Sequence, residues 1–60
     1  MIDEDELPHT VVYFLYYEPR RMLREPAANR AEGWQIARRL RAKGYEIRGV
    51  YPERGTRKAN

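Results

Sequence analysis

The sequence contains no cysteine and no serine, and His9 is its one histidine. Without cysteine the chain can form neither disulfides nor thiolate metal sites, and a single imidazole does not make a zinc site. The remaining nucleophiles are Thr10, Thr56 and five tyrosines, and no base or orienting group stands in register with them. The sequence therefore predicts a protein that is not an enzyme. We expect no catalytic residue, metal site, cofactor or small-molecule substrate.

Long apolar runs are also absent, the longest being residues 11–17. A membrane helix needs roughly 20 apolar residues. The first six residues, MIDEDE, are acidic, whereas a signal peptide starts with a basic region. We therefore expect a soluble, cytoplasmic protein that does not enter a membrane.

Charge is unevenly distributed over the 60 residues. Residues 1–9 carry four acidic side chains and no Lys or Arg, whereas residues 10–60 carry twelve basic and five acidic side chains, a net charge of +7. Ten of the twelve basic residues are arginines, whose planar guanidinium group suits phosphate and carboxylate. The basic part therefore favours anionic partners. A GC-rich coding sequence would produce the same arginine content without any functional role.

Residues 10–17 are expected to form the first strand, because β-branched and aromatic side chains dominate them. Residues 11–17 contain no charged residue, so both faces of this strand need cover. Pro19 cannot donate a hydrogen bond to a strand ladder and is expected to end the strand. Residues 18–29 are therefore predicted to form a loop.

A helix is predicted over residues 30–43. Asn29 and Glu32 form a variant capping box at its start, although Pro26 could begin it earlier. Apolar residues recur in it every three or four positions, as in an amphipathic helix with arginines on its sides and back. The alternation that follows predicts a second strand over residues 45–51.

Strand, helix and strand in this order predict an α/β fold with a single βαβ unit over residues 10–54, in which the two strands are parallel and the crossover is right-handed. A flexible acidic arm, residues 1–9, precedes this unit, and a basic tail, residues 55–60, follows it. One helix leaves a face of the sheet bare, and two-stranded sheets are marginal in water. We therefore expect a homodimer whose first strands pair antiparallel at the centre of a four-stranded sheet. The alternative is a surface that docks a different protein.

Two groups of side chains are candidate contact sites, and Trp34 is expected in the core. Arginines after the first strand are candidates for binding nucleic acid or another anion, because ligands of α/β units gather at the carboxyl ends of strands and helix amino ends attract anions. Two arginines of the helix are candidates as well. The candidate arginines are Arg20, Arg21, Arg24, Arg38 and Arg41. The candidates for the dimer or partner interface are Val12, Tyr13, Phe14, Tyr16 and Tyr17.

The order of several short motifs resembles the first βαβ unit of serine recombinases. The motifs are Gln35 on the helix, Gly44-Tyr45-Glu46-Ile47, Val50-Tyr51 and Gly55-Thr56. In that family the apolar first strand ends in a Tyr-x-Arg-x-Ser motif. Residues 12–19 contain neither the serine nucleophile nor the arginine of that motif, so no catalytic residue is carried over. The resemblance implies the βαβ fold and no activity.

Two functions fit these observations. The first is a small non-enzymatic interaction module, of the kind that phages and mobile elements encode, which engages a host protein through its aromatic strand. The second is a basic accessory protein that binds nucleic acid through the arginine-rich loop and the helix. The dependence of affinity on salt would distinguish them, because phosphate contacts are lost steeply as salt rises.

Overall fold

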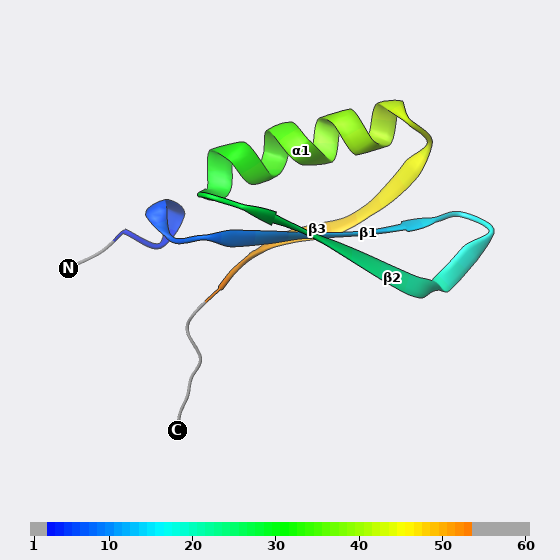
Figure 1. Cartoon of the computed structure of the whole chain (residues 1–60), viewed down its shortest axis with the longest axis horizontal. Helices are drawn as coiled ribbons and strands as arrows, with labels where there is room; N and C mark the ends of the chain where they lie inside the picture. Colours follow the sequence, from blue (N-terminus) through cyan, green and yellow to red (C-terminus); the bar gives the residue numbers. More distant parts are fainter. Residues whose placement is uncertain (1–2, 54–60) are drawn as a thin grey trace, which may run out of the picture.

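The computed structural model describes residues 3–53, so Met1, Ile2 and the predicted basic tail lie outside the described residues. The three strands form one antiparallel sheet in the order β2-β1-β3, and α1 lies along one face of it (Figure 1). The elements in chain order are the 3-10 helix η1 (Glu4–Glu6), β1 (His9–Leu15), β2 (Glu18–Ala27), α1 (Arg30–Ala42) and β3 (Tyr45–Pro52).

The predicted βαβ unit with two parallel strands is wrong. β3 pairs antiparallel with β1, from Leu15 opposite Tyr45 to His9 opposite Pro52. The difference arises in the segment predicted to be a loop, which instead forms the ten-residue strand β2. β2 carries the chain back along β1, so α1 begins at the end of the sheet where β1 begins (Figure 1). The helix then delivers β3 to the far end of the sheet, and β3 must run antiparallel to β1.

β2 forms although it contains Pro19 and Pro26, because it lies at an edge of the sheet. A proline lacks the backbone N–H that a central strand donates, and an edge strand tolerates that loss. β2 is also irregular near its start. Between the pairs Tyr13–Leu23 and Leu15–Glu18, β1 advances by two residues while β2 advances by five.

β1 is the central strand, since β2 pairs with one of its edges and β3 with the other. It therefore has no free edge on which to pair with β1 of a second copy. The expected four-stranded sheet with two first strands at its centre is incompatible with this arrangement.

The helix predicted over residues 30–43 lies at Arg30–Ala42. Its start is capped in both directions: the Glu32 amide donates to Asn29 Oδ1 at 2.9 Å, and the Ala28 amide donates to Glu32 Oε1. Its end is followed by Gly44 at a φ of 103°, a conformation that glycine adopts without a steric penalty.

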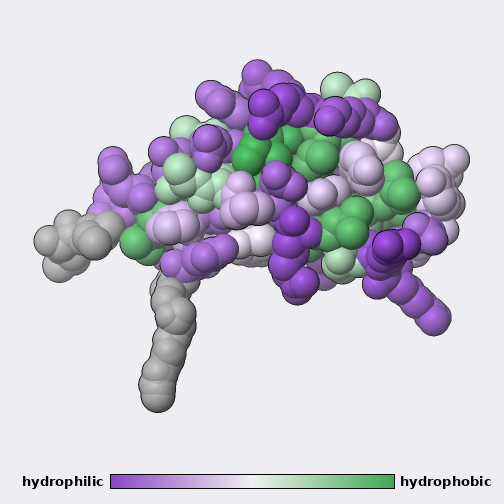
Figure 2. All heavy atoms as spheres, in the orientation of Figure 1, coloured by the Kyte–Doolittle hydropathy of each residue, from purple (hydrophilic) through white to green (hydrophobic). Residues whose placement is uncertain are grey.

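The core lies between α1 and the sheet. Its buried apolar side chains are Val11, Ala27, Ile36 and Ala37, and Tyr13, Leu40, Ile47 and Val50 pack around them. Apolar side chains gather between the helix and the sheet, below the hydrophilic back of the helix (Figure 2). Gly33 permits close contact, because a Cβ atom there would lie 2.6 Å from Val50 Cγ1.

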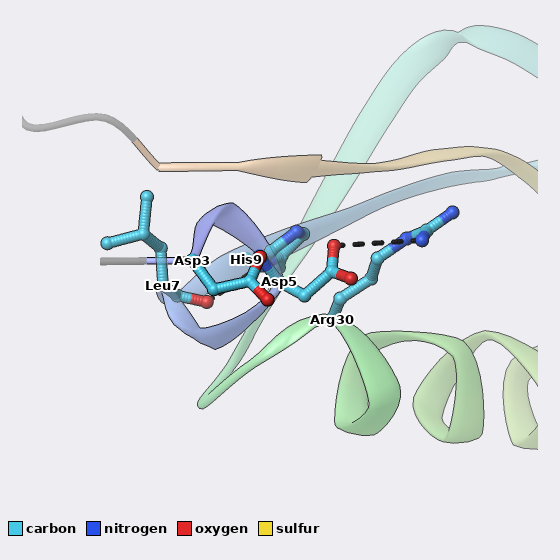
Figure 3. Close-up of polar contacts among 5 residues, drawn as sticks. All are labelled: Asp3, Asp5, Leu7, His9 and Arg30. Atoms are coloured by element: carbon cyan, nitrogen blue, oxygen red, sulfur yellow. Dashed lines mark hydrogen bonds and ion pairs between the residues drawn. The ribbon is translucent and has the colours of Figure 1, made fainter. Parts of the chain in front are cut away.

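The acidic segment before the sheet forms η1, and His9 behind it opens β1. His9 is buried, with 2% of its surface exposed. Its Nδ1 lies 2.8 Å from the Leu7 carbonyl oxygen, and a carbonyl only accepts, so this nitrogen carries the proton. Asp5 of η1 pairs with Arg30 in the first turn of α1, which links the acidic segment to the helix (Figure 3).

Candidate functional site

The three arginines that follow the first strand are not beside the helix amino end. Arg20, Arg21 and Arg24 all lie on β2, and all are exposed. β2 starts at the hairpin end of the molecule, whereas α1 starts at the opposite end (Figure 1). Arg24 is paired with Val12 and so points to the face away from the helix. Arg21 lines a shallow hollow with Leu15 and other residues of the hairpin end.

The two helix arginines do come together with other functional side chains. Arg38 and Arg41 lie on the β3 side of α1, where they line a groove of about 420 Å³ between the helix and β3. Trp34 and Arg48 line the same groove, and Ala37, Ile47 and Gly49 complete it. We call this the α1–β3 groove.

Arg48 lies at an irregularity of β3. Val12 pairs with Gly49 and Tyr13 with Ile47, so Arg48 is one extra residue without a partner on β1. Such a bulge changes the direction of a side chain relative to the regular alternation of a strand. Here it is the bulge residue that adds a third guanidinium to the α1–β3 groove.

The groove is strongly cationic. Its lining includes three arginines and no carboxylate. Within residues 3–53 none of these arginines forms an ion pair, and the ion pair that is formed joins Arg30 to Asp5 at 3.7 Å. The other side of α1 differs, since Glu25 lies there with Arg39 and Lys43. Within residues 3–53 the lining on the β3 side of the helix therefore holds guanidinium groups without a carboxylate, whereas the lining on the β2 side contains one.

Trp34 forms a wall of the α1–β3 groove and has 47% of its surface exposed, although the sequence predicted it in the core. It also lines a second hollow of about 380 Å³ beside the start of α1, together with Asp5, Glu6 and Arg30. The acidic helix η1 therefore lies at one end of the cationic groove. Trp34 and Arg48 were not among the candidate site residues predicted from the sequence. Trp34 could have been found, because it is four residues from Arg38 and seven from Arg41 and so shares their helix face.

The five interface candidates of the predicted first strand, residues 10–17, lie in three different places. Val12 and Phe14 point away from α1, whereas Tyr13 faces the helix side. The ring of Tyr13 packs edge-to-face against that of Tyr45, with 5.1 Å between the ring centroids. Tyr16 and Tyr17 lie at the hairpin tip and are 72% and 64% exposed, with 5.2 Å between their ring centroids. Burial of Tyr13, helped by Glu25 and Tyr45, raises the pKa of its phenol above the usual value.

Comparisons of the chain with protein families, with curated proteins and with solved structures find no match. Among the described residues, no helix has the length and apolar character needed to cross a bilayer. Within residues 3–53 no three His, Asp or Glu side chains are arranged so that they could hold a metal ion.

Proposed function

We propose that the protein binds single-stranded nucleic acid in the α1–β3 groove, without chemical turnover. The observation that carries the proposal is one groove that combines a half-exposed tryptophan with three guanidinium groups, which within residues 3–53 have no ion-pair partner and no carboxylate beside them in the lining. Proteins that bind single strands combine a cationic groove along the backbone with aromatic rings on which bases stack. The groove supplies both components.

The two walls of the groove have different parts in this binding mode. Arg38 and Arg41 are three residues apart on α1, so their Cβ atoms are about 5–6 Å apart on one helix face. Arg48 stands opposite them on β3. A strand that runs along the groove therefore meets guanidinium groups on both sides. Trp34, at the end of this row, offers the indole ring to a base, a contact that tolerates any sequence.

The proposal can be tested with the fluorescence of Trp34, which is the single tryptophan of the chain. Titration with a thymidine oligonucleotide about ten nucleotides long should quench this fluorescence if bases stack on the indole. The affinity should fall linearly with the logarithm of the salt concentration, with a slope of about −0.7 for each phosphate contact to a single strand.

A matched pair of variants locates the contact. Arg38→Ala with Arg41→Ala removes two charges from the groove, so the slope should flatten by about 1.4. Arg39→Ala with Lys43→Ala removes two charges from the other side of the same helix and should flatten it much less.

Equal effects of the two pairs would refute binding in the groove, as would an unchanged Trp34 fluorescence at saturation. Tighter binding of polyglutamate than of the oligonucleotide would show instead that the groove serves an acidic protein.

A further inference from the structure

The face of the sheet turned away from α1 has an apolar centre and opposite charges at its two sides. We call it the open face. Val12 and Phe14 form its apolar centre along β1, between Arg24 on β2 and Glu46 on β3. At one end of this centre the Thr10 hydroxyl donates to a carboxylate oxygen of Glu53. No element within residues 3–53 covers it (Figure 1). Val12 and Phe14 are both partly exposed.

The two charges of the open face have no partner within residues 3–53. Neither Arg24 nor Glu46 forms a hydrogen bond or an ion pair within the part of the chain that the structure describes. Register places Arg24 level with Val12 and Gly49, and Glu46 level with Phe14. The two side chains are therefore separated by the width of β1 and by two positions along the strands.

Gly49 and Tyr51 shape the β3 side of the open face. A Cβ atom on Gly49 would lie 2.6 Å from the Tyr51 hydroxyl oxygen and 2.7 Å from its Cζ atom. The tyrosine ring therefore occupies the space above the glycine, and its hydroxyl donates to the Arg48 carbonyl oxygen at 3.4 Å. Tyr51 is 48% exposed, so the ring is available to a cation from outside the chain.

We propose that two copies of the chain pack their open faces together about a two-fold axis that runs parallel to the strands. This rotation places β2 of one copy over β3 of the other and keeps each residue at its height along the strands. Arg24 then lies over Gly49 of the partner, with the partner's Tyr51 and the partner's Glu46 each about 7 Å away along the strand. Facing sheets are about 10 Å apart, a distance that an arginine can span to a carboxylate or an aromatic ring.

The charge pattern selects this axis over the other one that brings the faces together. A two-fold axis perpendicular to the strands would place β2 over β2 and β3 over β3, so that both Arg24 side chains would lie on one side of the interface and both Glu46 side chains on the other. Like charges across an interface are strongly unfavourable. The axis parallel to the strands forms two equivalent Arg24–Glu46 contacts and covers Val12 and Phe14 of both copies.

The open face is small, since three strands about 4.8 Å apart span it in one direction and the seven residues of β1 in the other. An interface of this size lies at the low end of those that form specific complexes. We therefore expect a weak dimer, with appreciable dimer only above roughly 100 µM.

Analytical ultracentrifugation between 10 µM and 1 mM tests the proposal through a charge exchange. Arg24→Glu and Glu46→Arg each place like charges at two symmetric positions and should weaken the dimer about tenfold or more. The double variant, R24E with E46R, exchanges the two charges and should restore most of the association. Circular dichroism and thermal melting would check that each variant is folded.

Arg39→Glu is the control, because it reverses a charge on the helix side of the molecule and should leave the dimer unchanged. A wild-type protein that is monomeric at 1 mM would overturn the proposal, and so would a double variant as weak as the single ones. The experiment contains no nucleic acid, so its result does not depend on whether the α1–β3 groove binds one.

Discussion

Replacing Gly33 with alanine should destabilise this protein, although alanine is the better helix former. In a helix interior the substitution alone would stabilise by about 1 kcal/mol. Here the added methyl group would lie 2.6 Å from Val50 Cγ1, whereas carbon atoms in contact are about 3.5–4.0 Å apart. Forcing a methyl group into a packed core costs about 1–3 kcal/mol. We expect a net loss of about 1 kcal/mol, as the balance of these two effects.

Removing the side chain that opposes the new methyl group should reverse the sign. In a Val50→Ala background, Gly33→Ala meets no Cγ1 atom and should stabilise the protein by up to about 1 kcal/mol. A change of 1 kcal/mol shifts the melting temperature of a domain of this size by about 4–8 °C, so both signs are measurable by circular dichroism. The four proteins form a double-mutant cycle that isolates the contact.

An exposed position of the same helix provides the reference for helix propensity. Gln35→Gly should be about 1 kcal/mol less stable than Gln35→Ala without any change in packing. If Gly33→Ala raised the melting temperature in both backgrounds, α1 would have to lie farther from β3 than it does here, and the reasoning on close packing would be refuted.

Three further predictions concern the helix cap, the Tyr13 phenol and the acidic segment. Asn29→Ala should lower the stability by about 1 kcal/mol, since the Glu32 amide loses its acceptor, and Asn29→Asp should retain most of it; an unchanged urea midpoint for Asn29→Ala would exclude a capping role. The pKa of the Tyr13 phenol is raised in the folded state, so folding favours its protonated form. The contribution of Tyr13 to the stability should therefore be full below pH 10, the ordinary pKa of a phenol, and should be lost as the pH rises through the folded-state pKa. Melting curves between pH 9 and pH 11 should show a smaller decline for Tyr13→Phe, and equal declines would contradict the assignment. Asp5→Asn with Glu6→Gln removes negative charge beside the α1–β3 groove, so the affinity for single-stranded DNA should rise at low salt. At 1 M salt the affinity should change little, because the Debye length is about 3 Å. Equal affinities of the variant and the wild type at low salt would show that η1 does not compete with the ligand.

The helix could be predicted from the sequence because its signals are local. Asn29 and Glu32 are three residues apart, as a cap requires, and the apolar residues after them follow the helical period. Each signal depends on neighbours along the chain, and the structure places the helix at Arg30–Ala42.

β2 could not be predicted because the property that permits it is its place in the sheet. Ten residues with two prolines and three arginines do not resemble a strand in isolation. An edge strand needs only one hydrogen-bonded side and little burial, and Ala27 is the one buried residue of β2. Missing this one strand reversed the predicted direction of β3, so the fold was wrong although the helix and the other two strands were expected near their actual places.

The candidate site was predictable in part for the same reason. Arg38 and Arg41 share a helix face with Trp34, which follows from their spacing. Arg48 joins them only because β3 has a bulge and lies beside α1, and both features depend on the antiparallel topology. Trp34 was expected in the core because it lies where the helix was predicted to bury apolar surface. Gly33 and Ala37 bring α1 so close to the sheet that a large side chain is left at the margin of the contact.

The two proposed surfaces are compatible, because each uses a different side of the sheet. A dimer formed through the open faces would place the two helices on the outside and leave both α1–β3 grooves accessible. β3 of one copy would lie over β2 of the other, so the grooves would open at opposite edges of the dimer. One strand of nucleic acid that reached both grooves would bind the second at a high effective concentration, which raises the overall affinity without any new contact. A dimer that is weak in isolation would then be stabilised by the nucleic acid that it binds, because only the dimer offers two grooves to one strand.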